Sequence, residues 1–546
     1  MDYKNAYNTW LNYKSIDKEI LKELQEMDDE TIKLCFSNNL SFGTAGMRSI
    51  MGSGTNRLNI YTLRKATLGF ANYLIKYNKE NLTKGIVIGH DNRLNSRKFC
   101  LDCASLLSSK GIKVYIFDDL RPTPEISFAI RKLNAIGGII ITASHNPKEY
   151  NGYKVYDETG CQLTDYKNSL LVTEIDNVEN ILSYSFKENK SLITILDNNF
   201  DSIYYNEIKK LTLNNPNKQN FKIVYSPQHG TALNGVKQIL TSLGYSLFLV
   251  ESQCTYDPHF SNTLSPNPED EKAYIEAINL AKKIDADLIL TTDPDGDRIG
   301  IAIKHKNEYH LLTGNQTASL ILDYLLTHKK HNKNSLIITS IVTTSLIEEI
   351  AKKHNTFFKQ TLTGFKYIGE TITKYQNEKD FIFAAEESYG CALSPIVRDK
   401  DSLQAALIIS EMTCLYKNNN QTLIDKLNEL YKEYGYYYDK VISYSLDPIN
   451  GQQKITQIMN NLRTKNLTNI ANYKIKEIHD YLKGYETFPK SNVIKILFED
   501  NSFIAIRPSG TEPKYKVYYC LVAKTKKDAL IKFQNISKEF NNIIIN

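Results

Sequence analysis

Residues 142–147 (TASHNP) place a serine hydroxyl in a setting suited to chemistry. Ser144 and His145 follow directly after an apolar run, and Lys154 lies close behind in the sequence. Reactive groups collect where parallel strands end and their loops leave the sheet. A hydroxyl there, beside backbone N–H groups, is suited to accepting and releasing a phosphoryl group. A simple turn is the alternative interpretation, because Ser, Asn and Pro also favour turns.

In residues 291–298 (TTDPDGDR), again directly after an apolar run, every second position from 293 to 297 is an aspartate: Asp293, Asp295 and Asp297. If the loop curls, these oxygens converge on one point, which suits Mg²⁺. A calcium-binding EF-hand loop would need a glutamate about seven residues further on, within flanking helices. The chain continues instead as a strand-like IGIAIK. A solvated acidic turn is the other alternative, but three neighbouring carboxylates repel one another unless a cation neutralises them.

Two further segments supply complementary groups. Residues 386–390 (EESYG) follow an apolar strand, and their carboxylates can hold sugar hydroxyls by charge-assisted hydrogen bonds. Residues 507–514 (RPSGTEPK) combine a guanidinium, two hydroxyls and free N–H groups, which form a phosphate cradle. Taken singly, they also fit surface glutamates and a hairpin loop. With the first two segments they complete the parts that phosphoryl transfer needs. The sequence has no GxxxxGK[ST] or GxGxxG motif, so a nucleotide is not the expected donor.

Alternating strand and helix patterns must position these segments. Apolar runs at residues 85–89, 112–119 and 136–141 alternate with helical patterns, which predicts βαβ units and a parallel sheet. The pattern restarts near residue 221, with a long helix predicted over 269–283 and a strand at 287–290, and again before residue 335. The part of the chain beyond residue 437 has strand patterns followed by a helix over 526–540, which suits a small α+β domain.

The length, charge and cysteine content of the chain limit its domain number, its partners and its expected location. A chain of 546 residues predicts about three to five domains. The net charge of +6 is small and spread along the chain, so neither nucleic acid nor a membrane is an expected partner. No signal-peptide-like or membrane-spanning apolar stretch is visible, and the eight cysteines are scattered. We therefore expect a cytoplasmic protein, with Cys100 and Cys103 as buried thiols; the sequence does not distinguish a monomer from a dimer.

At these four segments the chain resembles the α-D-phosphohexomutase family, which includes phosphoglucomutase and phosphomannomutase. The resemblance extends over nearly the whole chain, with the segments in family order. It implies three related α/β domains with mixed sheets and a C-terminal α+β (TBP-like) domain around a central cleft. The implied phosphoserine, metal-binding, sugar-binding and phosphate-binding domains are residues 1–195, 196–308, 309–435 and 436–546.

The resemblance also assigns roles to individual residues. Ser144 matches the serine that is phosphorylated in the resting enzyme, and one Mg²⁺ per chain would bind its phosphate together with Asp293, Asp295 and Asp297. The implied catalytic residues besides Ser144 are His145 and Lys154, for proton transfer, and Arg48 of residues 41–48 (SFGTAGMR). Residues 89–93 (GHDNR) are expected to support the serine loop. The implied substrate-binding residues are Arg298, Thr363, Gly364, Phe365, Lys366, Glu386, Ser388, Arg507, Ser509, Gly510 and Thr511.

The implied reaction interconverts glucose 1-phosphate and glucose 6-phosphate, and possible further substrates are mannose phosphates. Glucose 1,6-bisphosphate would be the intermediate and activator. The segments EESYG and TGFKYIGE look more like the bacterial phosphoglucomutase branch and its phosphopentomutase relatives than like phosphoglucosamine mutases. The alternatives are a phosphopentomutase, a metal-dependent sugar phosphatase and a non-catalytic sugar-phosphate sensor.

Overall fold

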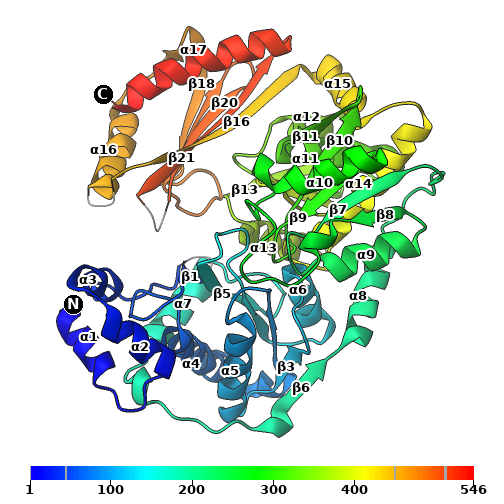
Figure 1. Cartoon of the computed structure of the whole chain (residues 1–546). Helices are drawn as coiled ribbons and strands as arrows, with labels where there is room; N and C mark the ends of the chain where they lie inside the picture. Colours follow the sequence, from blue (N-terminus) through cyan, green and yellow to red (C-terminus); the bar gives the residue numbers. More distant parts are fainter. Residues whose placement is uncertain (1, 44–45, 448–449, 510–512, 546) are drawn as a thin grey trace. The chain divides into compact units, whose positions relative to one another are not determined.

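The computed structural model describes residues 2–43, 46–447, 450–509 and 513–545 (Figure 1). The chain divides into two compact units. Unit 1 contains Met1–Leu312, Gly369–Gln376 and Gly390–Leu415. Unit 2 contains Thr313–Ile368, Asn377–Tyr389 and Tyr416–Asn546. Both units therefore combine segments that are distant in the sequence.

The first sheet of unit 1 is mixed and has the strand order β1-β5-β4-β2-β3-β6. β2 pairs in parallel with β3 and β4, whereas β5 runs antiparallel to β4 and to β1. Every residue of β2 and β4 is buried, as their continuous apolar sequences predict. The elements of this region are α1 (Tyr3–Leu11), α2 (Lys18–Glu26), α3 (Asp29–Phe36), β1 (Met47–Ile50), α4 (Ile60–Tyr77), η1 (Lys79–Lys84), β2 (Ile86–His90), α5 (Ser96–Ser109), β3 (Val114–Phe117), α6 (Thr123–Lys132), β4 (Gly137–Ile141), β5 (Tyr150–Asp157), α7 (Asp165–Asp176), η2 (Ile181–Ser183), η3 (Lys190–Leu192) and β6 (Ile193–Leu196).

The second sheet of unit 1 has the order β11-β10-β9-β7-β8, with β7 parallel to β8 and β9 and antiparallel pairing beyond β9. Its elements are α8 (Asn198–Lys209), β7 (Lys222–Ser226), α9 (Leu233–Ser242), β8 (Ser246–Leu249), η4 (Glu251–Gln253), η5 (Glu271–Tyr274), α10 (Ile275–Ile284), β9 (Leu288–Thr292), β10 (Ile299–His305) and β11 (Glu308–Leu312). The helix predicted over 269–283 is wrong at its start. The Asp270 side chain accepts the Lys272 N–H and fixes a 3₁₀ turn first, so the α-helix begins at Ile275.

In unit 2, β12 pairs in parallel with β13 and β14, which forms the core of the third α/β region. The C-terminal sheet is antiparallel throughout, in the order β16-β21-β20-β19-β18-β17, and α16 and α17 pack against it. The remaining elements of the chain are α11 (Gly314–His328), β12 (Ser335–Ser340), α12 (Leu346–Lys353), β13 (Phe357–Thr361), α13 (Phe365–Tyr375), β14 (Asp380–Glu386), β15 (Gly390–Ala392), α14 (Ser402–Asn418), α15 (Leu423–Tyr434), β16 (Tyr436–Ser445), α16 (Gly451–Thr464), β17 (Asn469–Ile470), β18 (Tyr473–Asp480), β19 (Ile494–Phe498), β20 (Phe503–Pro508), β21 (Lys514–Ala523) and α17 (Lys526–Ile545). Of these, β15 and most of α13 and α14 belong to unit 1.

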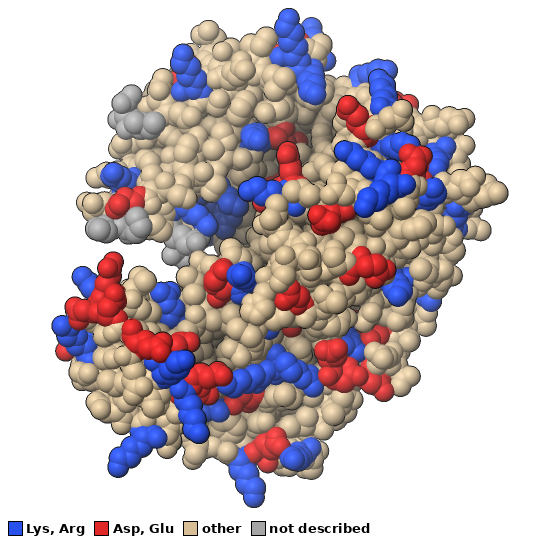
Figure 2. All heavy atoms as spheres, in the orientation of Figure 1, with Lys and Arg blue, Asp and Glu red and all other residues tan. Residues whose placement is uncertain are grey.

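The predicted fold class is confirmed: three α/β regions with mixed sheets precede a C-terminal α+β domain. Basic and acidic side chains are interspersed on the visible face, in keeping with the small net charge (Figure 2). Within the described residues, every helix is too short or too polar to cross a bilayer.

One carboxyl group in the core of unit 1, that of Glu125, is buried without a hydrogen-bond partner among the described residues. Glu125 on α6 is 0% exposed, and neither of its carboxyl oxygens has a hydrogen-bond partner among the described residues. Burial, reinforced by the negative charge of Asp201, raises the pKa of Glu125 well above its usual range; the opposing effect of Arg121 is smaller. The folded protein therefore holds the Glu125 proton more tightly than the unfolded chain does.

We expect this proton to make unit 1 less stable as the pH rises. Above the unfolded pKa of about 4.3 the folded state binds more protons than the unfolded chain, so the free energy of unfolding falls until the raised pKa is reached. In Glu125→Gln this fall should disappear, which stabilises the protein at pH 8 relative to the wild type by about 1–2 kcal/mol. Chemical denaturation at pH 5 and pH 8 measures the difference. The exposed Glu179→Gln is the control, and identical pH slopes in all three proteins would contradict the prediction.

Candidate functional site

The serine loop leaves the carboxyl end of β4 and returns into β5. Ser144 has a φ of 52°, in the left-handed region that costs a non-glycine residue about 1–2 kcal/mol. Its N–H donates to Thr142 Oγ1 at 2.9 Å, and its side chain is buried. Ser144 Oγ donates to Asp293 Oδ2 at 3.0 Å and lies 3.1 Å from His145 Nδ1. The hydroxyl is thus held by a carboxylate that is 149 residues away.

A single arginine holds this loop from beneath. Arg93 is 3% exposed, and Asp91 Oδ2 lies 3.3 Å from its Nε. Its two terminal nitrogens donate to four carbonyl oxygens of the loop, those of Ser144, Asn146, Pro147 and Tyr150. Only the planar five-donor guanidinium can serve so many acceptors at once. The expectation that residues 89–93 support the serine loop therefore has a direct geometric basis.

The acidic loop connects β9 to β10. One carboxylate oxygen each from Asp293, Asp295 and Asp297 lies within 4.8 Å of the others, and all three side chains are buried. Asp293 Oδ1 accepts the backbone N–H groups of Asp297 and Arg298 at 3.1 and 3.0 Å. Asp295 Oδ1 and Asp297 Oδ1 have no hydrogen-bond partner among the described residues. Buried carboxylate oxygens without donors are suited to ligating a cation.

Two buried lysines face the acidic loop. Lys154 Nζ on β5 lies 2.8 Å from Asp295 Oδ2, and Lys400 Nζ lies 2.9 Å from Asp297 Oδ2. Burial acts to raise the pKa of Asp295, but the Lys154 ammonium outweighs it and holds that pKa well below its usual range. Burial and the neighbouring charges of Asp297 and Asp295 raise the pKa of Asp293. The crowding of the three carboxylates therefore disfavours the ionised form of Asp293 as long as no cation is bound.

The other predicted residues of unit 1 lie close to these two loops. Arg48 on β1 is exposed and donates to Asn146 Oδ1 of the serine loop at 2.9 Å. Arg298 pairs with Glu269 at 2.5 Å and lies 3.7 Å from Asp297 Oδ1. Unit 1 thus brings together a hydroxyl, an imidazole, two ammonium groups and three carboxylates.

The predicted residues of unit 2 lie at the start of α13, at the end of β14 and at the end of β20. Thr363 and Gly364 precede α13, and Phe365 and Lys366 begin it. The Gly364 N–H donates to Glu386 Oε1 at 2.7 Å, so these two predicted segments are in contact. Phe365 and Lys366 are buried, and Ser388 is half-buried just after β14. Arg507 ends β20, and the Ser509 N–H donates to Lys514 O at 2.8 Å. Gly510 and Thr511 lie outside the described residues.

Four family models match the chain in order. They describe the α/β/α domains I, II and III of phosphoglucomutase/phosphomannomutase, at residues 39–181, 202–306 and 313–434, and the C-terminal domain at residues 459–520. The chain is 38% identical to a phosphoglucomutase of Staphylococcus epidermidis over 557 aligned positions, which cover 99% of this chain and 100% of the relative. It is 39% identical to a phosphoglucomutase of Staphylococcus aureus, with 93% of each chain covered.

The chain belongs to the phosphoglucomutase/phosphomannomutase family. Solved structures share its fold. A putative phosphomannomutase from Thermus thermophilus aligns with a TM-score of 0.71 at 19% identity, covering 93% of this chain and 100% of that one. A Paramecium phosphoglucomutase, pp63/parafusin, in an open form, aligns with a TM-score of 0.72 at 21% identity, covering 92% and 95%. The resemblance noted in the sequence is confirmed.

The sequence did not reveal that Lys400 lies at the acidic loop. It lies in the segment RDKDS (398–402), where Arg398, Asp399, Lys400 and Asp401 are all buried. The Asp399 carboxylate accepts from Tyr156 and Gln162, each at 2.8 Å, and lies 3.1 Å from Lys400 Nζ. The available signal was a run of four charges between the apolar stretches PIV and LQAAL, a pattern more typical of a solvated loop.

Proposed function

We propose that this protein is a phosphoglucomutase that interconverts α-D-glucose 1-phosphate and glucose 6-phosphate through a phosphoserine. The observation that carries the proposal is the buried Ser144 hydroxyl, 3.0 Å from Asp293 Oδ2 at the edge of a three-carboxylate loop. A nucleophile at an acidic, lysine-flanked loop suits phosphoryl transfer. The choice of glucose is supported by the phosphoglucomutases that are 38–39% identical along the chain.

The acidic loop fits a magnesium ion. Asp293, Asp295 and Asp297 each offer a buried oxygen, and two oxygens of the loop are without donors among the described residues. These are the hard ligands that Mg²⁺ prefers, and the phosphate on Ser144 would complete the set. Once bound, the ion neutralises the charge of the transferring phosphoryl group.

The chain's own groups account for the proton movements. In the first step the P–O bond to Ser144 Oγ breaks and a P–O bond to the free sugar hydroxyl forms, which yields glucose 1,6-bisphosphate. The sugar hydroxyl gives up its proton, and we assign this transfer to Lys154, whose Nζ lies 2.8 Å from Asp295 Oδ2 at the acidic loop. His145 Nδ1, 3.1 Å from Ser144 Oγ, supplies the proton that the departing serine oxygen takes up. In the second step the other phosphate of the bisphosphate moves to Ser144, and the protons return.

The remaining predicted residues are assigned to substrate recognition. Glu386 is positioned by the Gly364 N–H, and we assign residues 363–366, Glu386 and Ser388 to the sugar hydroxyls. Arg507 and Ser509, with Gly510 and Thr511, are assigned to the phosphate that is not transferred. Arg48 and Arg298 are assigned to charge neutralisation at the transferring phosphate.

A ³¹P NMR time course tests the proposed function. The full chain is supplied with glucose 1-phosphate, Mg²⁺ and a trace of glucose 1,6-bisphosphate. We expect glucose 6-phosphate to grow without release of inorganic phosphate. Inorganic phosphate as the main product would indicate a phosphatase instead. In a second reaction, ribose 1-phosphate replaces glucose 1-phosphate. Turnover of ribose 1-phosphate without turnover of glucose 1-phosphate would indicate a phosphopentomutase.

Arg93→Lys should impair catalysis although Arg93 does not touch the substrate. Lysine keeps the positive charge but cannot serve four carbonyls, so the serine loop loses its anchor. We expect kcat to fall by about 100-fold, the effect of misplacing a reacting group by about 1 Å. Steady-state kinetics and the melting temperature measure this. Arg97→Lys is the matched control, because Arg97 donates to the single carbonyl of Phe117. Equal losses in both variants would contradict a positioning role.

A further inference from the structure

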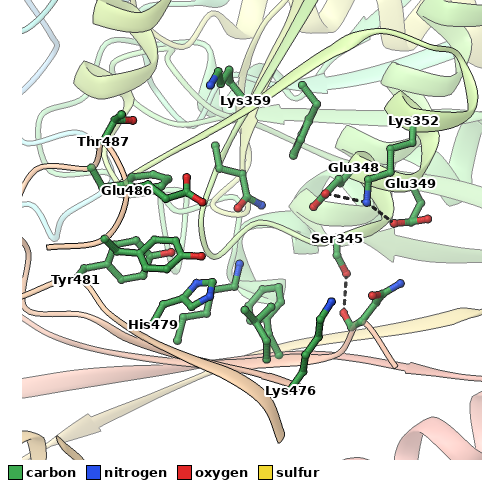
Figure 3. Close-up of a pocket in the computed structure, with 18 residues that line it drawn as sticks. Ser345, Glu348, Glu349, Lys352, Lys359, Lys476, His479, Tyr481, Glu486 and Thr487 are labelled. Atoms are coloured by element: carbon green, nitrogen blue, oxygen red, sulfur yellow. Dashed lines mark hydrogen bonds and ion pairs between the residues drawn. The ribbon is translucent and has the colours of Figure 1, made fainter. Parts of the chain in front are cut away.

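A second pocket lies within unit 2, between the third α/β region and the C-terminal sheet (Figure 3). It has a volume of about 400 Å³, within the range of small-molecule sites. Its walls come from α12 and β13 on one side and from β18, β19 and residues 481–488 on the other. None of the residues assigned to phosphoglucomutase chemistry above is among those that line it.

The strongest pointer to a ligand is a buried ammonium group. Lys495 lines the pocket, is 4% exposed, and donates to Ile341 O at 2.7 Å, with its nitrogen 4.2 Å from the Phe503 ring centroid. No described carboxylate forms an ion pair with it. Burial lowers the pKa of Lys495 to about 8, against smaller raising effects of Cys520 and Glu348. A buried cation without a counter-ion is costly, and an anion in the pocket would relieve that cost.

The remaining charges favour an anion as well. The pocket is lined by the carboxylates of Glu348, Glu349 and Glu486. The first two are occupied by Lys352, at 2.8 and 3.0 Å (Figure 3). That leaves Lys359, Lys476 and Lys495, none of which is ion-paired within the described part of the chain, against the single carboxylate of Glu486. Lysine ammonium groups are common phosphate ligands.

Aromatic side chains form one wall of the pocket. The rings of His479 and Tyr485 are stacked with centroids 3.8 Å apart, and Tyr481 meets Phe488 edge to face at 5.3 Å. Phe358 and Phe503 also line the pocket. Such surfaces bind flat rings by stacking, while the nearby side chains of Gln360, Asn501 and Thr487 offer hydrogen bonds to a ring edge.

We propose that this pocket binds a small phosphate ester that carries a flat ring, which is the chemistry of a nucleotide. The phosphate lies at Lys495 and Lys476, and the ring lies against the aromatic wall. Such a ligand contacts α12, β13 and β18 together, so it stabilises unit 2 on binding. This inference does not depend on the proposed glucose phosphate reaction.

Isothermal titration of the full chain with AMP, GMP and UMP tests the proposal. Saturating glucose 6-phosphate is present throughout, so that the phosphate-binding residues assigned to catalysis are occupied. We expect saturable binding of a nucleotide, and a loss of about tenfold or more in affinity in Lys495→Met, because a charge-assisted contact is removed. Ribose 5-phosphate, which has the phosphate but no ring, should bind at least about tenfold more weakly.

The control uses a lysine of unit 2 that does not line the pocket. Lys440→Met, at an exposed position of β16, should change the affinity by less than about twofold. Lys476→Met, at an exposed position, should weaken nucleotide binding several-fold. If Lys495→Met lowers the melting temperature, so that its weaker binding could reflect damage to the fold, Lys476→Met is the variant that tests the proposal. The proposal is overturned if none of the three nucleotides binds at millimolar concentration. It is equally overturned if ribose 5-phosphate binds as well as they do, or if Lys476→Met binds like the wild type.

Discussion

Ser144→Ala should abolish isomerisation, with a loss of about 10⁴-fold or more in kcat, because the covalent step has no other hydroxyl in place. Ser144 is fixed by Thr142 Oγ1 and by the four carbonyl contacts of Arg93, none of which needs the serine hydroxyl. The fold should therefore survive. Coupled measurement of glucose 6-phosphate formation gives kcat, and intact-protein mass spectrometry shows whether the phosphoryl adduct is lost.

Ser105→Ala provides the matched control. Its hydroxyl is also hydrogen-bonded to a carboxylate, Glu188, but lies on α5 away from the acidic loop. We expect it to keep wild-type activity and the phosphoryl adduct. If Ser144→Ala retained isomerase activity, or if the adduct persisted in it, the phosphoserine scheme would be refuted.

Removal of divalent cations should have the second largest effect. Treatment with EDTA should lower kcat by about 10³-fold or more, because the developing phosphoryl charge then faces three buried carboxylates with no divalent ion between them. Added Mg²⁺ should restore activity. It should also raise the melting temperature, since a ligand at 100 times its Kd stabilises the folded state by about 2.7 kcal/mol.

The variant Asp295→Asn separates the ion from general salt effects. It removes one charge from the loop and should abolish the Mg²⁺-dependent rise in melting temperature. Asp257→Asn, a carboxylate of the same unit outside the acidic loop, should keep that rise. Full activity in EDTA, or an unchanged Mg²⁺ response in Asp295→Asn, would show that the acidic loop is not a functional metal site.

The sequence predicts the loops of this site well because of how parallel sheets are built. Ser144 and Asp293 each follow an apolar run, and both runs are buried strands, β4 and β9. Loops at the carboxyl ends of such strands are where reactive groups gather. The CxxC cysteines are also buried, as the apolar helix pattern predicts.

The tertiary partners of these loops could not be predicted in the same way. Lys400 reaches Asp297 only because the segment 390–415 folds into unit 1, and no local pattern encodes that contact. The four acceptors of Arg93 likewise depend on the path of the serine loop in three dimensions. The helix start near residue 270 was missed because the Asp270 side chain selects a 3₁₀ turn over an α-helical one.

Unit 1 is built from three separate segments of the chain, and this has a consequence for its synthesis on the ribosome. Asp297 and Lys400 are about 100 residues apart in the sequence. At a translation rate of about 5–20 residues per second, Lys400 is therefore synthesised roughly 5–20 seconds after the acidic loop. Asp401 and Ser402, which bond to Tyr204 and to the Gly296 carbonyl, emerge just as late. A nascent chain that ends near residue 312 thus contains carboxylates and tyrosines that are buried in the folded protein but do not yet have their partners from the segment 390–415. We expect such a chain to depend on chaperones until the segment 390–415 has emerged and docked.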